Sequence, residues 1–212
     1  MLQKRENKGR RLSAGAVLVT GILLHPLAAN AWDRQYVFGD SLSDSGNNGR
    51  YTWDGSSHPL YDDLLAAKLE QTLKPSKDGG TNFAAGGAVA VPALNPQDNT
   101  QDQVQHYLAA NGGRADANGL YIHWIGGNDL AAAAINPIQA PGIVGNSALA
   151  AASQVQTLLS AGANTVIVPT VPDIGATPAL LEGVIQGGLT PVADAALAAA
   201  FQSLNSQTTL ST

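Results

Sequence analysis

The sequence contains no cysteine, so neither a disulfide bond nor a thiolate contributes to its stability or its chemistry. Aromatic residues make up only 5% of the 212 residues, and the formal net charge is −5. This charge excludes an electrostatic reason to bind nucleic acid, which requires concentrated positive charge. What is present is a 44% apolar chain, which is long enough for one domain with a sizeable core. We expect such a domain to be held together by packing.

Basic residues gather only at the N-terminus, where an apolar segment follows them. Residues 1–11 carry two lysines and three arginines, and the apolar stretch at 14–29 runs into an Ala-Asn-Ala cleavage pattern. The alternative is a membrane anchor, but the stretch is short for a span and is interrupted by His25 and a proline. We therefore expect residues 1–31 to be a signal peptide. The mature chain would be exported to the periplasm, the cell surface or the medium.

From residue 32 onward, short apolar runs alternate with longer segments of helical periodicity. The pattern predicts strands at 34–38, near Asn82, at 119–125 and at 164–169, and helices at 59–73, 100–110, 145–162 and 190–207. Strands that alternate with helices of this length indicate parallel β-α-β units. The expected fold is α/β, with a mainly parallel open sheet between two helical layers.

Each expected strand ends in a cluster of glycine and polar residues. These clusters are Gly39-Asp40-Ser41, Ala85-Gly86-Gly87, Gly126-Gly127-Asn128-Asp129 and Val171-Pro172-Asp173. In open parallel sheets, ligands bind outside the carboxyl ends of the strands, so the four clusters should share one edge. Turn chemistry explains a single cluster well, but it explains the convergence of four clusters much less easily.

The residue types in these clusters suit acyl transfer, which needs a nucleophile, a base and donors for a developing oxyanion. Ser41 can supply the nucleophile, and its backbone N–H can also face the oxyanion. Gly86 or Gly87 can offer a second backbone N–H, because a residue without Cβ lets a substrate approach the main chain. Asn128 can offer an uncharged side-chain donor. These residues are the candidate catalytic site.

Four stretches, "FGDSLSDSGN", "NFAAGGA", "GGND" and "VPDIGATP", resemble in order the first four sequence blocks of the GDSL, or SGNH, hydrolases. The likeness is greatest to the exported esterase passenger of bacterial autotransporters. It implies a flavodoxin-like fold for residues 32–212 and hydrolysis of small-molecule or lipid esters without a cofactor. It also implies that Ser41 is the nucleophile and that Asn128 donates to the oxyanion.

The same resemblance assigns an oxyanion role to a glycine of the second block. Both Gly86 and Gly87 are candidates, and Gly87 is favoured. Asp40 and Asp129 are expected to be hydrogen-bond acceptors that organise their loops rather than proton carriers.

No histidine follows Asn128, and this is a departure from the family pattern. The family takes its base from a fifth block, Asp-x-x-His, near the C-terminus of the domain. We therefore expect the domain to be incomplete at its C-terminus, as a fragment or as a truncated gene product. The resemblance implies that a full-length protein would continue into an outer-membrane β-barrel. The alternative function is a catalytically impaired exported passenger or binding module that retains the acyl pocket.

The four histidines give no obvious substitute for this base. His25 would leave with the signal peptide, and His106 lies on a helix expected to be exposed. His123 lies inside a strand, where a hydrogen-bonded core histidine is the expected role. His58 follows the nucleophile turn, and we predict that it contacts substrate rather than acting as the base.

Patterns for bound metals and cofactors are weak. The sequence has neither a P-loop nor a dinucleotide-binding G-x-G-x-x-G. The stretch "DSLSDSGNN" faintly resembles a calcium loop, but Tyr51 stands where an EF-hand needs its bidentate glutamate. We therefore expect no metal and no cofactor. The adjacent acids Asp62 and Asp63 are expected to lie on a solvated helix face.

Overall fold

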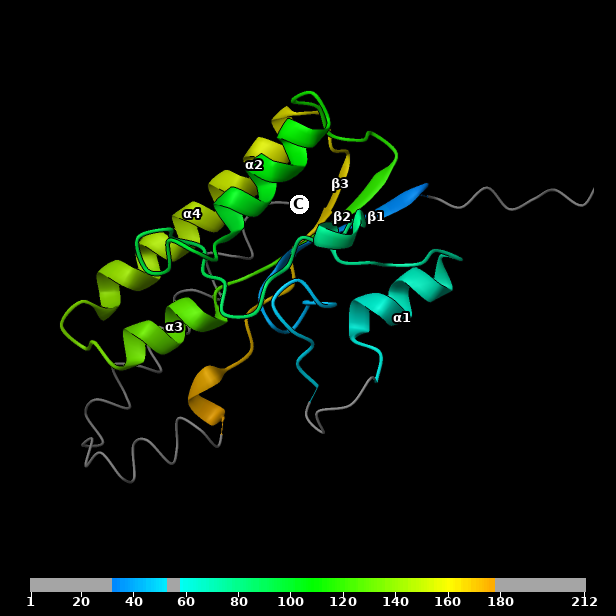
Figure 1. Ribbon diagram of the computed structural model, residues 1–212. Coiled ribbons are helices and arrows are strands. Elements are labelled where there is room, and N and C mark those ends of the chain that lie inside the picture. Colours follow the sequence, from blue (N-terminus) through cyan, green and yellow to red (C-terminus); the bar gives the residue numbers. More distant parts are fainter. Residues whose placement is uncertain (1–31, 53–57, 178–212) are drawn as a thin grey trace, which may run out of the picture.

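The computed structural model describes residues 32–52 and 58–177 (Figure 1). Their elements in chain order are β1 (Arg34–Gly39), α1 (Tyr61–Lys68), η1 (Ser76–Asp78), α2 (Thr100–Ala110), β2 (Gly119–Trp124), α3 (Gly127–Ala134), α4 (Ala140–Ser160), β3 (Thr165–Ile167) and η2 (Ile174–Ala176). The expected signal peptide and the helix expected at 190–207 lie outside the described residues. Within the described part of the chain, no helix is both long enough and apolar enough to cross a membrane.

The sheet is parallel, with the strand order β1-β2-β3. Residues 81–85 extend it along the free edge of β1, where Val37 N–H donates to Thr81 (3.1 Å) and Phe83 N–H donates to Val37 (2.7 Å). The strand expected near Asn82 is thus a short parallel ladder rather than a full strand. The predicted parallel sheet is confirmed.

Helices cover both faces of the sheet, with α2 and α4 on one side and α1 on the other (Figure 1). Neighbouring residues of a strand point to opposite faces, so Phe38 packs toward α2 and α4 while Val37 packs toward α1. Likewise, β2 sends Tyr121 to the first face and Ile122 to the second. Both strands are therefore buried on two sides, and the expected three-layer α/β/α architecture is confirmed.

Four of the described aromatic residues, Tyr36, Phe38, Tyr107 and Tyr121, are buried in the core. The ring of Tyr36 lies 4.8 Å from that of Tyr107 and 5.0 Å from that of Tyr121, measured between ring centroids. The hydroxyl oxygens of Tyr107 and Tyr121 are 2.7 Å apart, and Tyr36 Oη donates to Asp116 at 3.2 Å. Buried rings with paired hydroxyls therefore contribute both packing and hydrogen bonds to the core.

Two helix boundaries differ from the predicted ones, and one helix was not predicted. Helix α1 ends at Lys68 because Glu70 adopts a left-handed conformation (φ 57°) and Gln71 N–H closes onto Ala66. Helix α4 begins at Ala140 because its proline occupies the first turn, where the missing N–H costs nothing. Helix α3 follows β2 almost immediately, in a stretch that the sequence pattern indicated only as a polar turn.

Candidate active site

Strand β1 ends at Gly39, where the neighbouring strand comes too close for a side chain. A Cβ at this position would lie 2.4 Å from the Trp124 carbonyl oxygen of β2. The Gln103 side chain binds both backbone groups of Gly39, accepting from its N–H (2.9 Å) and donating to its carbonyl (2.9 Å). The strand end is therefore held firmly, and the residues after it are presented from a fixed point.

Ser41 lies in the turn directly after this strand end and is half-buried. The turn is closed by Ser43 N–H donating to the Asp40 carbonyl (3.1 Å) and by Leu42 N–H donating to Asp40 Oδ1 (3.0 Å). Within residues 32–52 and 58–177, no hydrogen bond engages either the Ser41 hydroxyl or its backbone N–H. Both groups are free to face a ligand.

The structure distinguishes the two candidate glycines. Gly86 N–H donates to the buried carboxylate of Asp44 at 2.8 Å, and a Cβ at Gly86 would lie 2.3 Å from the Tyr51 ring. Gly87 has φ +84° and open space at its Cβ position, with the nearest atom, Asn95 Nδ2, 4.0 Å away. Its N–H has no acceptor among the described residues. The Gly86 N–H is thus used internally, whereas that of Gly87 is available.

Asn128 lies in the first turn of α3 and is oriented by the glycine loop. Its Nδ2 donates to the Ala88 carbonyl at 2.7 Å, and Ala88 follows Gly87 in the chain. An amide nitrogen carries two N–H groups, and the second has no acceptor in the described part of the chain. Asn128 can therefore donate to a ligand while it remains anchored.

Contacts between the loops show that the strand ends converge. Ala85 N–H donates to the Gly39 carbonyl at 3.1 Å. A Cβ at Gly127 would lie 3.5 Å from Asp40 Oδ2, and one at Gly126 would lie 3.0 Å from Val171. All four polar clusters therefore meet at the carboxyl edge of the sheet, as the parallel arrangement predicted.

The two acids flanking this edge are hydrogen-bond acceptors, as expected. Asp129 is fully buried and accepts from Ala90 N–H (2.9 Å), Val91 N–H (3.3 Å) and Ser147 Oγ (2.7 Å). Burial raises the pKa of Asp40 to about 6, and the hydrogen bond from Leu42 N–H opposes that rise. Both carboxylates organise loops around the site.

A second layer of contacts joins the loop after Ser41 (residues 42–48) to the loop that contains Gly86 and Gly87 (residues 82–88). The sequence pattern indicated the residues of this layer only as turn formers. Asp44 is buried and accepts backbone N–H bonds from Gly46 (2.8 Å), Asn47 (2.6 Å), Asn48 (2.9 Å) and Gly86 (2.8 Å). Asn47 Nδ2 donates to the carbonyls at positions 82 and 84. These hydrogen bonds consequently join the two loops.

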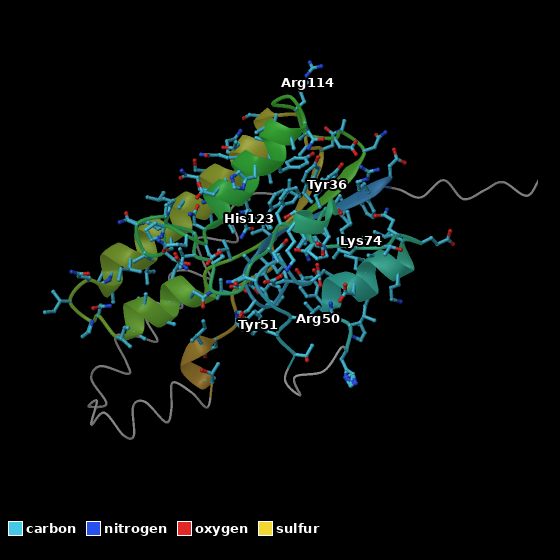
Figure 2. All side chains as sticks on the ribbon, in the orientation of Figure 1. Tyr36, Arg50, Tyr51, Lys74, Arg114 and His123 are labelled. Atoms are coloured by element: carbon cyan, nitrogen blue, oxygen red, sulfur yellow. The ribbon has the colours of Figure 1, made fainter. Side chains whose placement is uncertain are left out.

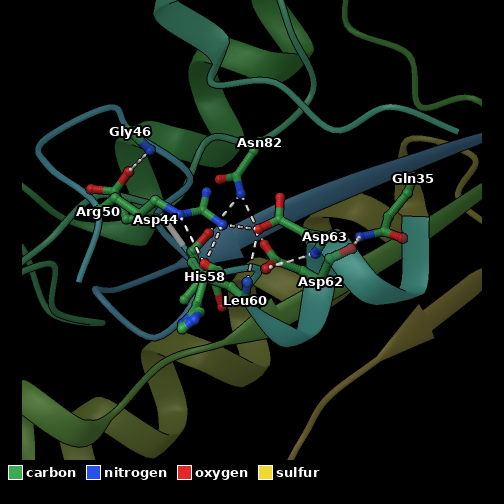
Figure 3. Close-up of polar contacts among 10 residues, drawn as sticks. Gln35, Asp44, Gly46, Arg50, His58, Leu60, Asp62, Asp63 and Asn82 are labelled. Atoms are coloured by element: carbon green, nitrogen blue, oxygen red, sulfur yellow. Dashed lines mark hydrogen bonds and ion pairs between the residues drawn. The ribbon is translucent and has the colours of Figure 1, made fainter. Parts of the chain in front are cut away.

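The expectation for the two adjacent acids of α1 was wrong. Asp62 is fully buried, accepts from Asn82 Nδ2 at 2.9 Å, and has its pKa raised to about 7 by burial and by the neighbouring carboxylate (Figure 3). Asp63 is half-buried, pairs with Arg50 and accepts from Leu60 N–H at 2.8 Å. Asp62 and Ala66, one helical turn apart, are the buried residues of α1. The small alanine at 66 was the sequence feature that could have indicated that this face of the helix is buried.

The described histidines are dispersed. His123 is buried, its Nε2 donates to Gln154 Oε1 of α4 at 2.9 Å, and burial lowers its pKa to about 4. It is the expected core histidine, and His106 is exposed on α2 as expected. His58 is exposed, and its backbone carbonyl accepts from Arg50 (Figure 3). The predicted contact between His58 and substrate stays a prediction.

Among the described residues, no group of three or more histidine or acidic side chains is placed to hold a metal ion. The described strand-end loops present a hydroxyl and a set of N–H donors. These groups can bind and polarise a carbonyl oxygen, or the oxyanion that forms from it.

Comparison with known proteins gives a consistent result. The family model of GDSL-like lipases and acylhydrolases matches residues 36–209. The chain is 58% identical over 166 residues to Lipase 1 of Photorhabdus luminescens, covering 76% of this chain and 26% of that protein. It is 31% identical over 183 residues to a Pseudomonas putida protein described as an uncharacterized protein in the trpE-trpG intergenic region, covering 71% and 30%. The chain thus spans less than a third of the length of these curated relatives.

Proposed function

Because the chain belongs to the GDSL-like lipase and acylhydrolase family, we propose that it forms the nucleophile and oxyanion-binding part of a serine ester hydrolase. One observation carries the proposal. A free hydroxyl and three N–H groups without acceptors in the described residues come from three different loops at one sheet edge. Donors left unpaired at a strand edge are suited to a ligand's oxygen.

In the proposed reaction, Ser41 Oγ attacks the ester carbonyl carbon and passes its proton to a base. The carbonyl oxygen becomes an oxyanion that accepts from the N–H groups of Ser41, Gly87 and Asn128. Each such donor contributes about 3–4 kcal/mol to transition-state stabilisation. The tetrahedral intermediate expels the alcohol and leaves an acyl-serine, which water then hydrolyses.

We propose that the base lies in an Asp-x-x-His block of a longer protein. His123 is neutral at physiological pH and held in the core, and His106 is exposed on α2. The much greater length of the relatives is compatible with such a block. The second candidate function, a binding module that retains the acyl pocket, would require that no base is supplied.

The substrate class that we propose is an ester with an apolar acyl group. Leu42, next to the nucleophile, is 45% exposed, and Tyr51, whose ring lies against Gly86, is 52% exposed. Figure 2 shows Tyr51 in the lower half of the view and Arg114, which precedes the amino end of β2, at the top. Apolar side chains beside a nucleophile provide a surface for an aliphatic chain. The name of the relative from Photorhabdus, Lipase 1, agrees with this class.

We further propose that residues 1–31 direct export and that the hydrolase is displayed at the cell surface or released. Support comes from the basic cluster, the apolar stretch and the Ala-Asn-Ala pattern. N-terminal sequencing of the protein recovered outside the cytoplasm should read Trp32 first. A sequence beginning upstream of residue 14 would indicate an uncleaved anchor instead.

The nucleophile is tested by covalent labelling of the full-length protein with a fluorophosphonate ester, followed by mass spectrometry of the labelled peptide. Ser41 should carry the label, and Ser41→Ala should remove it while Ser45→Ala, from the same loop, should not. A label on another serine would refute the assignment. If the 212-residue chain alone is labelled as fast as the full-length protein, a base lies within these residues and His58→Ala becomes the next variant.

A further inference from the structure

We propose that Asn48 is a positioning residue that aims the Gly87 N–H at the oxyanion, an inference that rests on the proposed function. Asn48 Nδ2 donates to the carbonyl oxygen of Gly86 at 2.8 Å. That carbonyl belongs to the peptide group that also contains the Gly87 N–H. The Asn48 side chain thus orients the Gly87 N–H through the planar peptide group that links Gly86 to Gly87.

Peptide geometry fixes the relation between these two groups. The described residues contain no cis peptide bond, so the Gly86 carbonyl and the Gly87 N–H point in opposite directions from their shared plane. Holding the carbonyl on one side therefore directs the N–H to the other. The Gly87 N–H has no acceptor among the described residues, so no other hydrogen bond holds this donor.

The glycine pair makes such a restraint necessary. Gly87 has φ +84°, and two consecutive glycines can rotate the peptide between them at little steric cost. On its N-terminal side, Gly86 is already held by Asp44, at 2.8 Å from its N–H. Without Asn48, the plane between Gly86 and Gly87 would lose its restraint, and the donor would occupy its productive direction for only part of the time.

Asn48 is itself well placed for this role. Its backbone N–H donates to Asp44 Oδ2 at 2.9 Å, and its carbonyl accepts from Tyr51 Oη at 3.1 Å. Its side chain is exposed, so its removal should cost little stability. This separates it from its neighbour Asn47, whose amide binds two carbonyls of the 82–84 segment and supports the fold.

The experiment compares Asn48→Ala and Asn48→Asp with wild type in the full-length protein, using p-nitrophenyl butyrate. The aspartate keeps the size of the side chain but has no N–H to donate, and its charge faces the Gly86 carbonyl. We expect kcat to fall by about ten- to a hundredfold in both variants, less than for outright loss of a donor. KM and the thermal unfolding midpoint should stay close to those of wild type.

The matched control is Asn164→Ala. Asn164 is also exposed and also donates through Nδ2 to a backbone carbonyl, that of Ala117 at 3.0 Å, but it lies immediately before β3. Its kcat should be unchanged. Unchanged kcat in both Asn48 variants would overturn the inference, and so would a fall in kcat accompanied by raised KM and a lowered unfolding midpoint. Fluorophosphonate labelling of wild-type Ser41 distinguishes failure of the Asn48 inference from failure of the proposed function. If Ser41 is not labelled in the wild-type protein, the hydrolase assignment itself is wrong.

Discussion

The tyrosine cluster (Tyr36, Tyr107 and Tyr121) and the strand-end loops both contain buried polar groups, but only the loops also carry accessible donors without an acceptor in the described residues. In the cluster, the hydroxyls of Tyr107 and Tyr121 bind each other, Asp116 N–H donates to Tyr107 Oη at 3.0 Å, and Tyr121 Oη donates to the Asp116 carbonyl at 2.9 Å. At the strand ends, Asp44 and Asp129 are equally well paired, yet donors beside them have no acceptor within the described residues.

This difference separates a structural network from a candidate site. Buried polar groups are almost always paired, so a fully paired network needs no function beyond stability. At the strand ends, by contrast, paired acids fix the directions of accessible N–H groups on Ser41, Gly87 and Asn128, and a ligand can use these donors. The comparison predicts that substitutions in the two regions have different consequences, and the predictions below are ordered from the largest expected effect.

The largest effect is expected for Asn128→Ala in the full-length protein, if it has the proposed hydrolase activity. Loss of one oxyanion donor should lower kcat by about 10²–10³-fold, with a smaller change in KM, because the donor acts mainly in the transition state. Steady-state kinetics with p-nitrophenyl butyrate measures both constants. A change confined to KM would instead make Asn128 a ground-state binding residue.

The matched variant in the other region is Tyr107→Phe. It removes the hydroxyl that links Tyr121 to the Asp116 N–H, so the free energy of unfolding should fall by about 1–3 kcal/mol. Its kcat should remain that of wild type, because the cluster does not form part of the strand-end loops. Equal losses of activity in the two variants would contradict the division between the regions.

The smallest effect concerns pH and the buried acid Asp62. Its pKa is raised to about 7 in the folded protein from an ordinary value of 3.8, so the folded state binds the proton more tightly between pH 4 and 7. Stability contributed by this group should therefore be present near pH 4 and be lost as the pH rises toward 7. Asp62→Asn cannot ionise, and its stability should fall less over that window.

Denaturant unfolding at several pH values measures this difference. His123 acts in the opposite direction over part of the window, because its pKa is lowered to about 4 and its stabilising effect is lost as the pH falls. The readout is consequently the difference between wild type and Asp62→Asn. Asp78→Asn, at an exposed position, is the control. Parallel pH profiles for wild type and Asp62→Asn would contradict a buried, raised Asp62.

The sequence predicted the elements whose signal is local. Strands β1 and β2, helix α2 and the parallel arrangement follow from apolar periodicity and from the lengths of the segments, and the structure confirms them. The sequence could not indicate α3, because Gly126-Gly127-Asn128-Asp129 has the composition of a turn. In the structure, the positive φ of Gly126 (122°) lets the chain pass directly from β2 into the helix. The burial of Asp62 was hidden for a similar reason, since its partner Asn82 lies twenty residues away.

By itself, the sequence determined which residues stand at the strand ends, and therefore that Ser41, Asn128 and a glycine of the second block face one edge. Strand ends can be predicted in this way because apolar periodicity and turn-forming residues are properties of a few neighbouring residues. Only the tertiary structure decided that the Gly86 N–H donates to Asp44 while the Gly87 N–H has no acceptor in the described residues. It also decided that Asn48 donates to the carbonyl of the peptide group between the two glycines. These contacts join residues that are about forty positions apart, so they depend on how β1 and the 81–85 ladder bring the two loops together.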